Sequence, residues 1–193
     1  MSIEKSLYEG QLIRLGPIDH EKDAAVESKW THDSQYLRLI AASPALPASP
    51  ERIKKKYEAL EKTVEESKNT FHFAIRLRSD IPDQNDRLLG FARLEWVEWT
   101  HGNASLRLAI GSPDDRRKGY GREALALLLR FAFEEMNLHR LSANIPAYNT
   151  AALAFFQKFG FVDEIRRRQA LQLDGQVWDA ISLGLLRAEW QKE

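Results

Sequence analysis

The stretch "DDRRKGYGREALALLLRFAF", residues 114–133, places four cationic side chains and two glycines directly before an apolar helical pattern. The first N–H groups of a helix have no partner within the helix, and the helix dipole adds partial positive charge there. Glycine lets backbone N–H groups approach an anion closely. The loop therefore favours an anion such as a pyrophosphate, the alternative being a solvated basic turn before a surface helix. Its cationic residues are Arg116, Arg117, Lys118 and Arg122, and its glycines are Gly119 and Gly121.

The composition makes any anion site a local feature. The chain has 193 residues, 44% of them apolar and 29% charged, which is ordinary for a globular protein. Its length favours one domain over residues 1–193. Lys+Arg and Asp+Glu are both 28, so no basic excess points to nucleic acid or to a membrane surface.

The chain contains no cysteine, which excludes disulfides, thiolate metal sites and a cysteine nucleophile. The five histidines do not share zinc-like spacing with carboxylates, so no metal site is predicted. The N-terminus lacks the layout of a signal peptide, and no apolar run approaches the roughly 18 residues of a membrane span. A cytoplasmic enzyme or binding domain is the expectation.

Hydrophobic periodicity predicts a single α/β domain. The proline-rich segment 43–50 is expected to be an exposed loop, residues 79–86 a turn, and Asp174-Gly175 a hairpin turn. Core candidates in the N-terminal helical region are Val26, Trp30 and Leu37. The predicted strands are 10–18, 70–78, 87–99, 103–111, 140–146, 161–173 and 176–186, and the predicted helices lie within 19–40, over 50–67, after the basic loop and over 150–160.

Two known phosphate motifs can be compared with the basic loop. No G-x-x-x-x-G-K-[ST] string occurs. The dinucleotide pattern G-x-G-x-x-A is met by Gly119, Gly121 and Ala124, but it should begin directly after a strand. Seven residues separate Gly119 from Gly111, where the preceding strand is predicted to end. A nicotinamide-binding fold is therefore weakly supported.

A different family accounts for more of the chain. Arg116-x-x-Gly119-x-Gly121 resembles the acetyl-CoA pyrophosphate loop of the GNAT acetyltransferase superfamily, and "NTAALAFFQKFGF" (149–161) is similar to its next motif. The segments "RLG…SKWTHD" and "DGQVWDAISLGLLRAEW" resemble the ribosomal-protein N-acetyltransferase branch, the RimJ/RimL-like group. The resemblance covers residues 10–190. It implies a GNAT-type acyl-CoA N-acyltransferase fold: a mixed central sheet flanked by helices, with splayed parallel strands in the middle.

The same resemblance implies an acetyl-CoA site between the strands at 106–110 and 141–145. Main-chain groups of Leu108 and Ile110 would align the pantetheine arm. Asn149 would bond the cofactor, cap the following helix, or do both. Phe156 would pack on the CoA arm. Backbone N–H groups of the segment Arg117, Lys118, Gly119, Tyr120, Gly121 and Arg122 would hold the pyrophosphate.

Acetyl transfer is expected to proceed by direct attack of an amine on the thioester, because the chain has no cysteine to acetylate. Glu95 is the preferred candidate base over Glu98, with water as the alternative. Phe156 stands where many family members place a proton-donating tyrosine. Ser142 or Tyr148 would then protonate the leaving thiolate, or no dedicated acid is used, since a thiolate of pKa about 8.5 leaves tolerably well.

The resemblance also locates an acceptor pocket under the N-terminal helices and the 43–50 loop. Trp30, Asp33 and Tyr36 are the candidate pocket residues there, and Trp96 or Trp99 would form a wall. The acceptor is an amine, either a small molecule or a protein N-terminus, and a homodimer is compatible with the family. The alternative function is a non-catalytic module that binds acyl-CoA.

Overall fold

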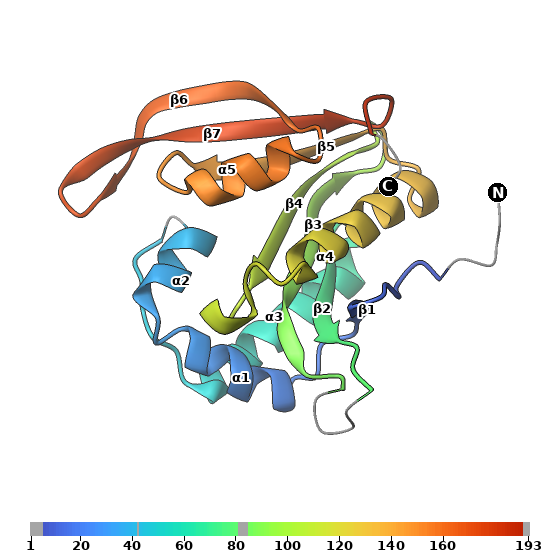
Figure 1. The fold of residues 1–193 in the computed structure, drawn as a ribbon, viewed down its shortest axis with the longest axis vertical. Coiled ribbons are helices and arrows are strands. Elements are labelled where there is room, and N and C mark those ends of the chain that lie inside the picture. The colour runs from blue at the N-terminus through green and yellow to red at the C-terminus, as the bar shows by residue number, and fades with distance from the viewer. Residues whose placement is uncertain (1–5, 42, 81–84, 191–193) are drawn as a thin grey trace.

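A computed structural model describes residues 6–41, 43–80 and 85–190. Its seven-stranded mixed sheet has the order β1-β2-β3-β4-β5-β7-β6, as Figure 1 shows. Every predicted strand and helix is present, with ends shifted by a few residues. The strands are β1 (Ile13–Gly16), β2 (Phe71–Leu77), β3 (Leu88–Glu98), β4 (Asn103–Ile110), β5 (Arg140–Pro146), β6 (Val162–Leu173) and β7 (Gln176–Leu186). The helices are α1 (Lys22–Trp30), α2 (Ser34–Ile40), α3 (Pro50–Ser67), α4 (Tyr120–Arg130) and α5 (Thr150–Gln157).

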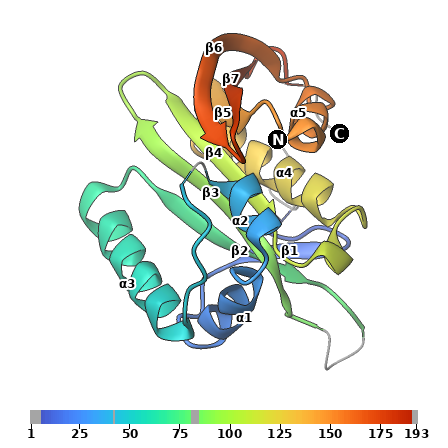
Figure 2. The ribbon, with the colours of Figure 1, turned by 90° about the vertical axis from the view of Figure 1, so that its left-hand side faces the viewer.

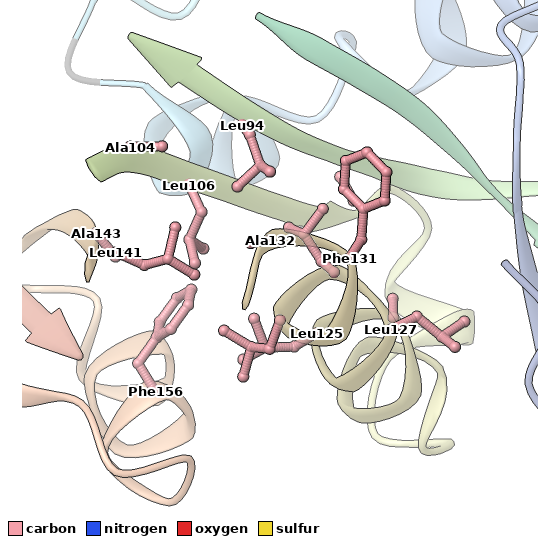
Figure 3. Packing of buried hydrophobic residues seen from close by; sticks show 14 of the residues in the cluster. Leu94, Ala104, Leu106, Leu125, Leu127, Phe131, Ala132, Leu141, Ala143 and Phe156 are labelled. Carbon is pink, nitrogen blue, oxygen red and sulfur yellow. The ribbon is translucent and has the colours of Figure 1, made fainter. Parts of the chain in front are cut away.

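The sheet carries helices on both faces, with α1, α2 and α3 on one side and α4 and α5 on the other (Figure 2). Leu125, Leu128, Leu129 and Ala132 of the α4 region are fully buried, as their helical spacing predicts. Figure 3 shows Leu125 of α4 facing the side chains of the sheet. The helix widens into a π-type turn over Phe131–Glu135 before it ends. The main core therefore lies between α4 and the sheet.

The N-terminal helices pack through polar as well as apolar side chains. Helix α3 begins as predicted, because Ser49 caps it and Pro50 occupies its first turn. Helix α1 differs from the prediction, since Val26 and Trp30 are only half-buried, while Asp23 and Glu27 are buried. The physical reason is pairing, because each of these acids has a basic or hydroxyl partner on a neighbouring element.

The turns follow their sequence signals. Asp174 and Gly175 both have positive φ, as a two-residue hairpin between β6 and β7 requires. Gly160, with φ +88°, ends the segment after α5. In the loop 43–50 most residues are exposed, but Ala48 is buried. Residues 81–84 of the predicted turn, and both ends of the predicted domain 1–193, lie outside the described residues.

The two central parallel strands separate along their length. Strand β4 pairs with β3 through Ile110, but it pairs with β5 only from Asn103 to Ser105, opposite Arg140 to Ser142. Beyond Ser105 the facing edges of β4 and β5 have no ladder between them. The predicted splay is confirmed, and it creates a wedge whose open end lies beside the basic loop. No helix in the described part of the chain has the length and apolar character needed to cross a membrane.

Candidate functional site

The basic loop leads into α4 with the geometry of an anion site. Gly119 caps the helix with φ +89°, a conformation that L side chains rarely adopt. The first bond within this helix runs from the N–H of Glu123 to the carbonyl of Gly119, at 3.0 Å. The N–H groups of Tyr120, Gly121 and Arg122 precede it, so they have no acceptor within the helix. Three backbone donors therefore stand at the positive end of the α4 dipole.

Side chains behind the loop hold it in place. Arg116 was predicted to add to the positive field, but its Nη2 donates to the carbonyl of Gly111 at 2.9 Å. It thus ties the loop to the end of β4. Asp115 is buried and accepts from both terminal nitrogens of Arg87, at 2.7 and 2.9 Å. The hydrogen bonds from Arg87 hold the pKa of Asp115 below its usual value. Arg117, Lys118 and Arg122 are exposed, and Lys118 Nζ lies 3.9 Å from the Asp115 carboxylate.

The Trp30 side chain packs against Gly111, directly before the same loop. An added Cβ at Gly111 would lie 2.1 Å from the Trp30 indole, so glycine is required where the two meet. The indole also packs edge-on against Tyr36 and Phe91, with ring centroids 6.0 and 5.8 Å apart. Trp30 is not among the residues that line the cavity described next, although Tyr36 and Phe91, which it contacts, are.

A cavity of about 440 Å³ occupies the wedge between β4 and β5. Leu106 and Leu108 of β4 and Ile145 of β5 form its sides, and residues of α2, β6 and β7 close it. Ile110 lies nearer the loop, where its side chain is 3.7 Å from a Cβ placed on Gly121. An extended ligand can therefore run from the loop at Gly121 along the open edge of β4.

Helix α5 contributes Asn149 and Phe156 to the cavity wall. The Oδ1 of Asn149 accepts from the N–H of Ala152 at 3.1 Å, and its Nδ2 donates to the carbonyl of Leu39 at 3.4 Å. Asn149 is therefore a helix cap that also ties α5 to α2. Phe156 is buried and packs edge-on against Phe161. Its ring presents a hydrocarbon surface and no proton donor.

On the other side of the cavity lies Glu27, which the sequence analysis did not identify. Its buried carboxylate accepts from the Tyr57 hydroxyl and from Lys56 Nζ, the latter at 2.8 Å. Burial, reinforced by the nearby negative charge of Glu27, raises the pKa of both Tyr36 and Tyr57 above the normal tyrosine value. The signal in the sequence was a pair of acids at positions 23 and 27, one helical turn apart beside Ala24 and Ser28.

Glu95, the predicted base, lies beside two arginines. Its Oε1 accepts from Arg93 Nη1 at 2.7 Å, and its Oε2 lies 2.9 Å from Arg107 Nε at ion-pair distance. It is not among the residues that line the cavity. Trp96, the next residue, has φ +53° at a bulge and is 60% exposed, so it does not wall the pocket as predicted. The bulge turns it outward.

The remaining candidates have local structural partners. Ser142 stands at the apex of the wedge, opposite Ser105, and its hydroxyl donates to the carbonyl of Ala104 at 3.4 Å. Tyr148 donates to the carbonyl of Arg38 at 2.7 Å. Asp33 caps α2 by accepting from the N–H of Gln35 at 2.9 Å, and it lies outside the cavity. Of the predicted acceptor residues, Tyr36 is the one that lines the cavity.

No group of three or more histidine, aspartate and glutamate side chains in the described residues is arranged to hold a metal ion.

Comparison with known proteins accounts for this arrangement. The family model described as "Acetyltransferase (GNAT) domain" matches residues 13–162. The chain is 22% identical over 134 residues to the spermidine N(1)-acetyltransferase of Vibrio cholerae serotype O1, covering 69% of this chain and 77% of that protein. It is 28% identical over 182 residues to "Probable N-acetyltransferase YjcK" of Bacillus subtilis (strain 168), covering 90% and 92%.

A solved structure has the same fold. The crystal structure of spermidine N-acetyltransferase from Vibrio cholerae, in complex with CoA and spermine, superimposes with a TM-score of 0.75 at 17% identity and covers 92% of this chain and 96% of that one. The family match includes both central strands and the loop before α4. The chain therefore belongs to the GNAT acetyltransferase family and is an acetyl-CoA-dependent N-acetyltransferase.

Proposed function

We propose that the protein transfers the acetyl group of acetyl-CoA to the primary amine of a small molecule. The observation that carries the proposal is the wedge between β4 and β5, which leads from the N–H groups at the start of α4 to a cavity of about 440 Å³. The loop suits a pyrophosphate, the wedge suits an extended arm, and the cavity leaves room for the reacting groups.

The donor is proposed to lie along the open edge of β4. The N–H groups from Tyr120 to Arg122 would bind the pyrophosphate, while exposed Arg117 and Lys118 add positive charge. Main-chain groups near Leu108 would pair with the amides of the pantetheine arm as a neighbouring strand would. Phe156 and Leu106 then supply apolar contact deeper in the cavity.

The chemical step is proposed to be direct attack. The lone pair of the neutral amine forms a bond to the thioester carbon, and the C–S bond breaks with its electron pair remaining on sulfur. The proton released by the amine passes to water, since the carboxylate of Glu95 is already paired with arginines. With no cysteine in the chain, no acetyl-cysteine can form.

Tyr36 is the residue we assign to the leaving thiolate. Tyr36 lies on α2, is buried, and lines the cavity. Burial raises its pKa, so the hydroxyl stays protonated throughout the working range and can donate a hydrogen bond to sulfur. A thiolate of pKa about 8.5 can leave without being protonated, so a hydrogen bond to its sulfur is sufficient.

A small acceptor is favoured over a protein N-terminus within the RimJ/RimL-like branch that the motifs suggest. Helix α2 and the β6–β7 hairpin form walls of the cavity, which limits the space around the amine. The similar Vibrio cholerae enzyme is a spermidine acetyltransferase, and its structure holds spermine. The alternative, a module that binds acyl-CoA without catalysis, receives no specific support. A homodimer remains part of the proposal, as does action in the cytoplasm.

The test combines binding and turnover. Purified protein is melted with acetyl-CoA, CoA or NADH, and free CoA thiol is measured during incubation with a panel of amines and one peptide. We expect stabilisation by both CoA species but not by NADH, and thiol release that depends on a small amine. Faster thiol release with the peptide than with every small amine would contradict the choice of acceptor.

A further inference from the structure

Two arginines face each other across the centre of the sheet. Arg93 on β3 and Arg107 on β4 are direct cross-strand partners, so their side chains leave the sheet on the same face. Their neighbours Leu94 and Leu106 point to the other face, toward α4 (Figure 3). Like charges directly opposite each other destabilise a sheet unless an anion lies between them. This arginine pair therefore requires negative charge on the face covered by α1, α2 and α3.

The protein supplies this arginine pair with one carboxylate. The Glu95 carboxylate lies at ion-pair distance from both arginines, 2.7 Å from Arg93 and 2.9 Å from Arg107, although its buried Oε2 makes no hydrogen bond among the described residues. The Nε of Arg93 is buried and has no hydrogen-bond partner among the described residues. A buried N–H that lacks an acceptor is costly in a finished structure. The pair is thus left with one positive charge in excess and with a donor to satisfy.

Both arginines line the reaction cavity, and so do Lys56 of α3 and Arg167 of β6. Glu27 is the one carboxylate among the described lining residues, and it is already bonded to Lys56 and Tyr57. The two arginines, Lys56 and Arg167 carry four positive charges, and Glu27 and Glu95 carry two negative charges. The side chains at this wall therefore have an excess of two positive charges. The basic loop follows the end of β4 at Ile110, and none of residues 114–122 lines this cavity, so these cations are separate from those of the loop.

We infer that the acceptor is a primary amine that also carries a carboxylate, and that Arg93 and Arg107 hold this carboxylate. The inference rests on the proposed function and names its substrate class. Guanidinium groups bind carboxylates in paired hydrogen bonds, and here the Arg93 side chain is 18% exposed and the Arg107 side chain 55% exposed. A polyamine would bring further positive charge to a wall that is already cationic, so it is disfavoured here.

The test uses amines of equal length that differ at one end. These are 5-aminopentanoate, pentylamine and 1,5-diaminopentane, which end in a carboxylate, a methyl group and an ammonium group. Shorter amino acids from glycine to 4-aminobutyrate scan the spacing, and 3-aminopropylphosphonate tests a phosphonate. The best carboxylate amine should exceed its uncharged and diamine counterparts at least tenfold in kcat/KM. Equal or better turnover of the diamine, the alkylamine or the phosphonate would overturn the inference.

Charge variants assign the preference to the arginines. Arg107→Gln should raise KM for the carboxylate amine about 10- to 100-fold with little change for the alkylamine, and Arg107→Glu should make the diamine the better substrate. Arg167→Gln should raise the same KM severalfold without disturbing the sheet. Its matched control is Arg168→Gln, since the neighbouring residue does not line the cavity. The assignment would be contradicted if Arg167→Gln and Arg168→Gln changed the KM for the carboxylate amine equally and Arg107→Glu still preferred that amine to the diamine.

Failure of the inference can be separated from failure of the proposed function. If acetyl-CoA fails to stabilise the protein and no amine releases thiol, the proposed function is wrong. If acetyl-CoA binds but no amine in the set turns over, calorimetry with the CoA complex decides. The carboxylate site is supported if the parent protein binds 5-aminopentanoate more tightly than 1,5-diaminopentane and if Arg107→Glu abolishes this difference. Equal or weaker binding overturns it.

Discussion

Arg87, at the entrance to β3, binds both carboxylate oxygens of Asp115 in the loop before α4, at 2.7 and 2.9 Å. Asp115 is buried, whereas Arg117 and Lys118, which follow it closely, are exposed. This ion pair connects the sheet to the segment that we propose binds the donor pyrophosphate through its backbone N–H groups. The position of the loop is therefore set by a residue far away in the sequence.

Breaking this ion pair is expected to weaken donor binding more than it weakens the fold. Asp115→Asn should raise the Kd for acetyl-CoA about tenfold, which corresponds to about 1.4 kcal/mol. Asp114→Asn is the matched control, because Asp114 is the exposed acid of the same turn and should change the Kd less than twofold. Calorimetric titration measures both. Equal Kd values for the two variants would show that the ion pair does not order the loop.

The two loop glycines are expected to respond differently to substitution. A Cβ at Gly121 would be 3.7 to 4.0 Å from its neighbours, so Gly121→Val fits the fold but fills the space beside the backbone donors. We expect a loss of acetyl-CoA affinity of about 100-fold, because charged hydrogen bonds contribute about 1.5–3 kcal/mol each. The unfolding midpoint without ligand should stay nearly unchanged.

Gly119 has φ +89°, so Gly119→Ala is strained whatever space it has. It should lower the free energy of unfolding by about 1 kcal/mol as well as weaken binding. Gly175→Ala, at φ +71° in the β6–β7 hairpin, is the control for strain alone. Unchanged acetyl-CoA affinity in both Gly119→Ala and Gly121→Val would refute the assignment of the pyrophosphate loop.

A buried ion pair joins α1 to the sheet. Arg76 of β2 donates to both oxygens of Asp23, at 2.8 and 3.2 Å, and also to the carbonyl of Pro17. Removing one partner leaves an uncompensated buried charge, so Asp23→Ala should cost about 3–5 kcal/mol in urea unfolding. The double variant with Arg76→Met should recover most of this loss. A single variant as stable as the parent chain would show that the pair carries no net energy.

His72 is expected to make the fold sensitive to acid. Burial, and then the charges of Arg93 and Lys56, lower its pKa from 6.5 to about 2. Between pH 6.5 and about pH 2, His72 is protonated in the unfolded state but not in the folded state. The folded state is therefore fully stabilised above about pH 6.5, and it loses stability as the pH drops below that value. The slope is about 1.4 kcal/mol per pH unit. His72→Phe should remove this part of the pH dependence in chemical unfolding, and an unchanged slope would contradict it.

Local patterns in the sequence were sufficient for the secondary-structure elements. The Ser49-Pro50 start of α3, the Asp174-Gly175 hairpin and the apolar stripe of α4 all depend on neighbouring residues. The acceptor side depends on register. The bulge at Trp96 and the alignment of Arg93 with Arg107 arise from pairing between strands, which a single sequence does not display.

The corrected site residues share one physical cause. Glu95 was a plausible base until its two arginine partners were placed beside it, and Arg116 was a plausible anion ligand until its guanidinium met the carbonyl of Gly111. In both cases the charged side chain interacts with another group of the protein itself. Glu27 was missed for the converse reason, since an acid on the buried face of α1 needs Tyr57 and Lys56 from another helix to be tolerated.

The central claim is that the loop before α4 and the wedge between β4 and β5 bind acetyl-CoA for transfer to an amine. Melting the protein with acetyl-CoA at 100 times its Kd tests it most directly, alongside thiol release. Such saturation adds about 2.7 kcal/mol of stability, or roughly 5–11 °C for a domain of this size. We predict this shift, its loss in Gly121→Val, and thiol release that depends on an amine. No shift with acetyl-CoA or CoA would contradict the assignment of residues 114–133 and the function built on it.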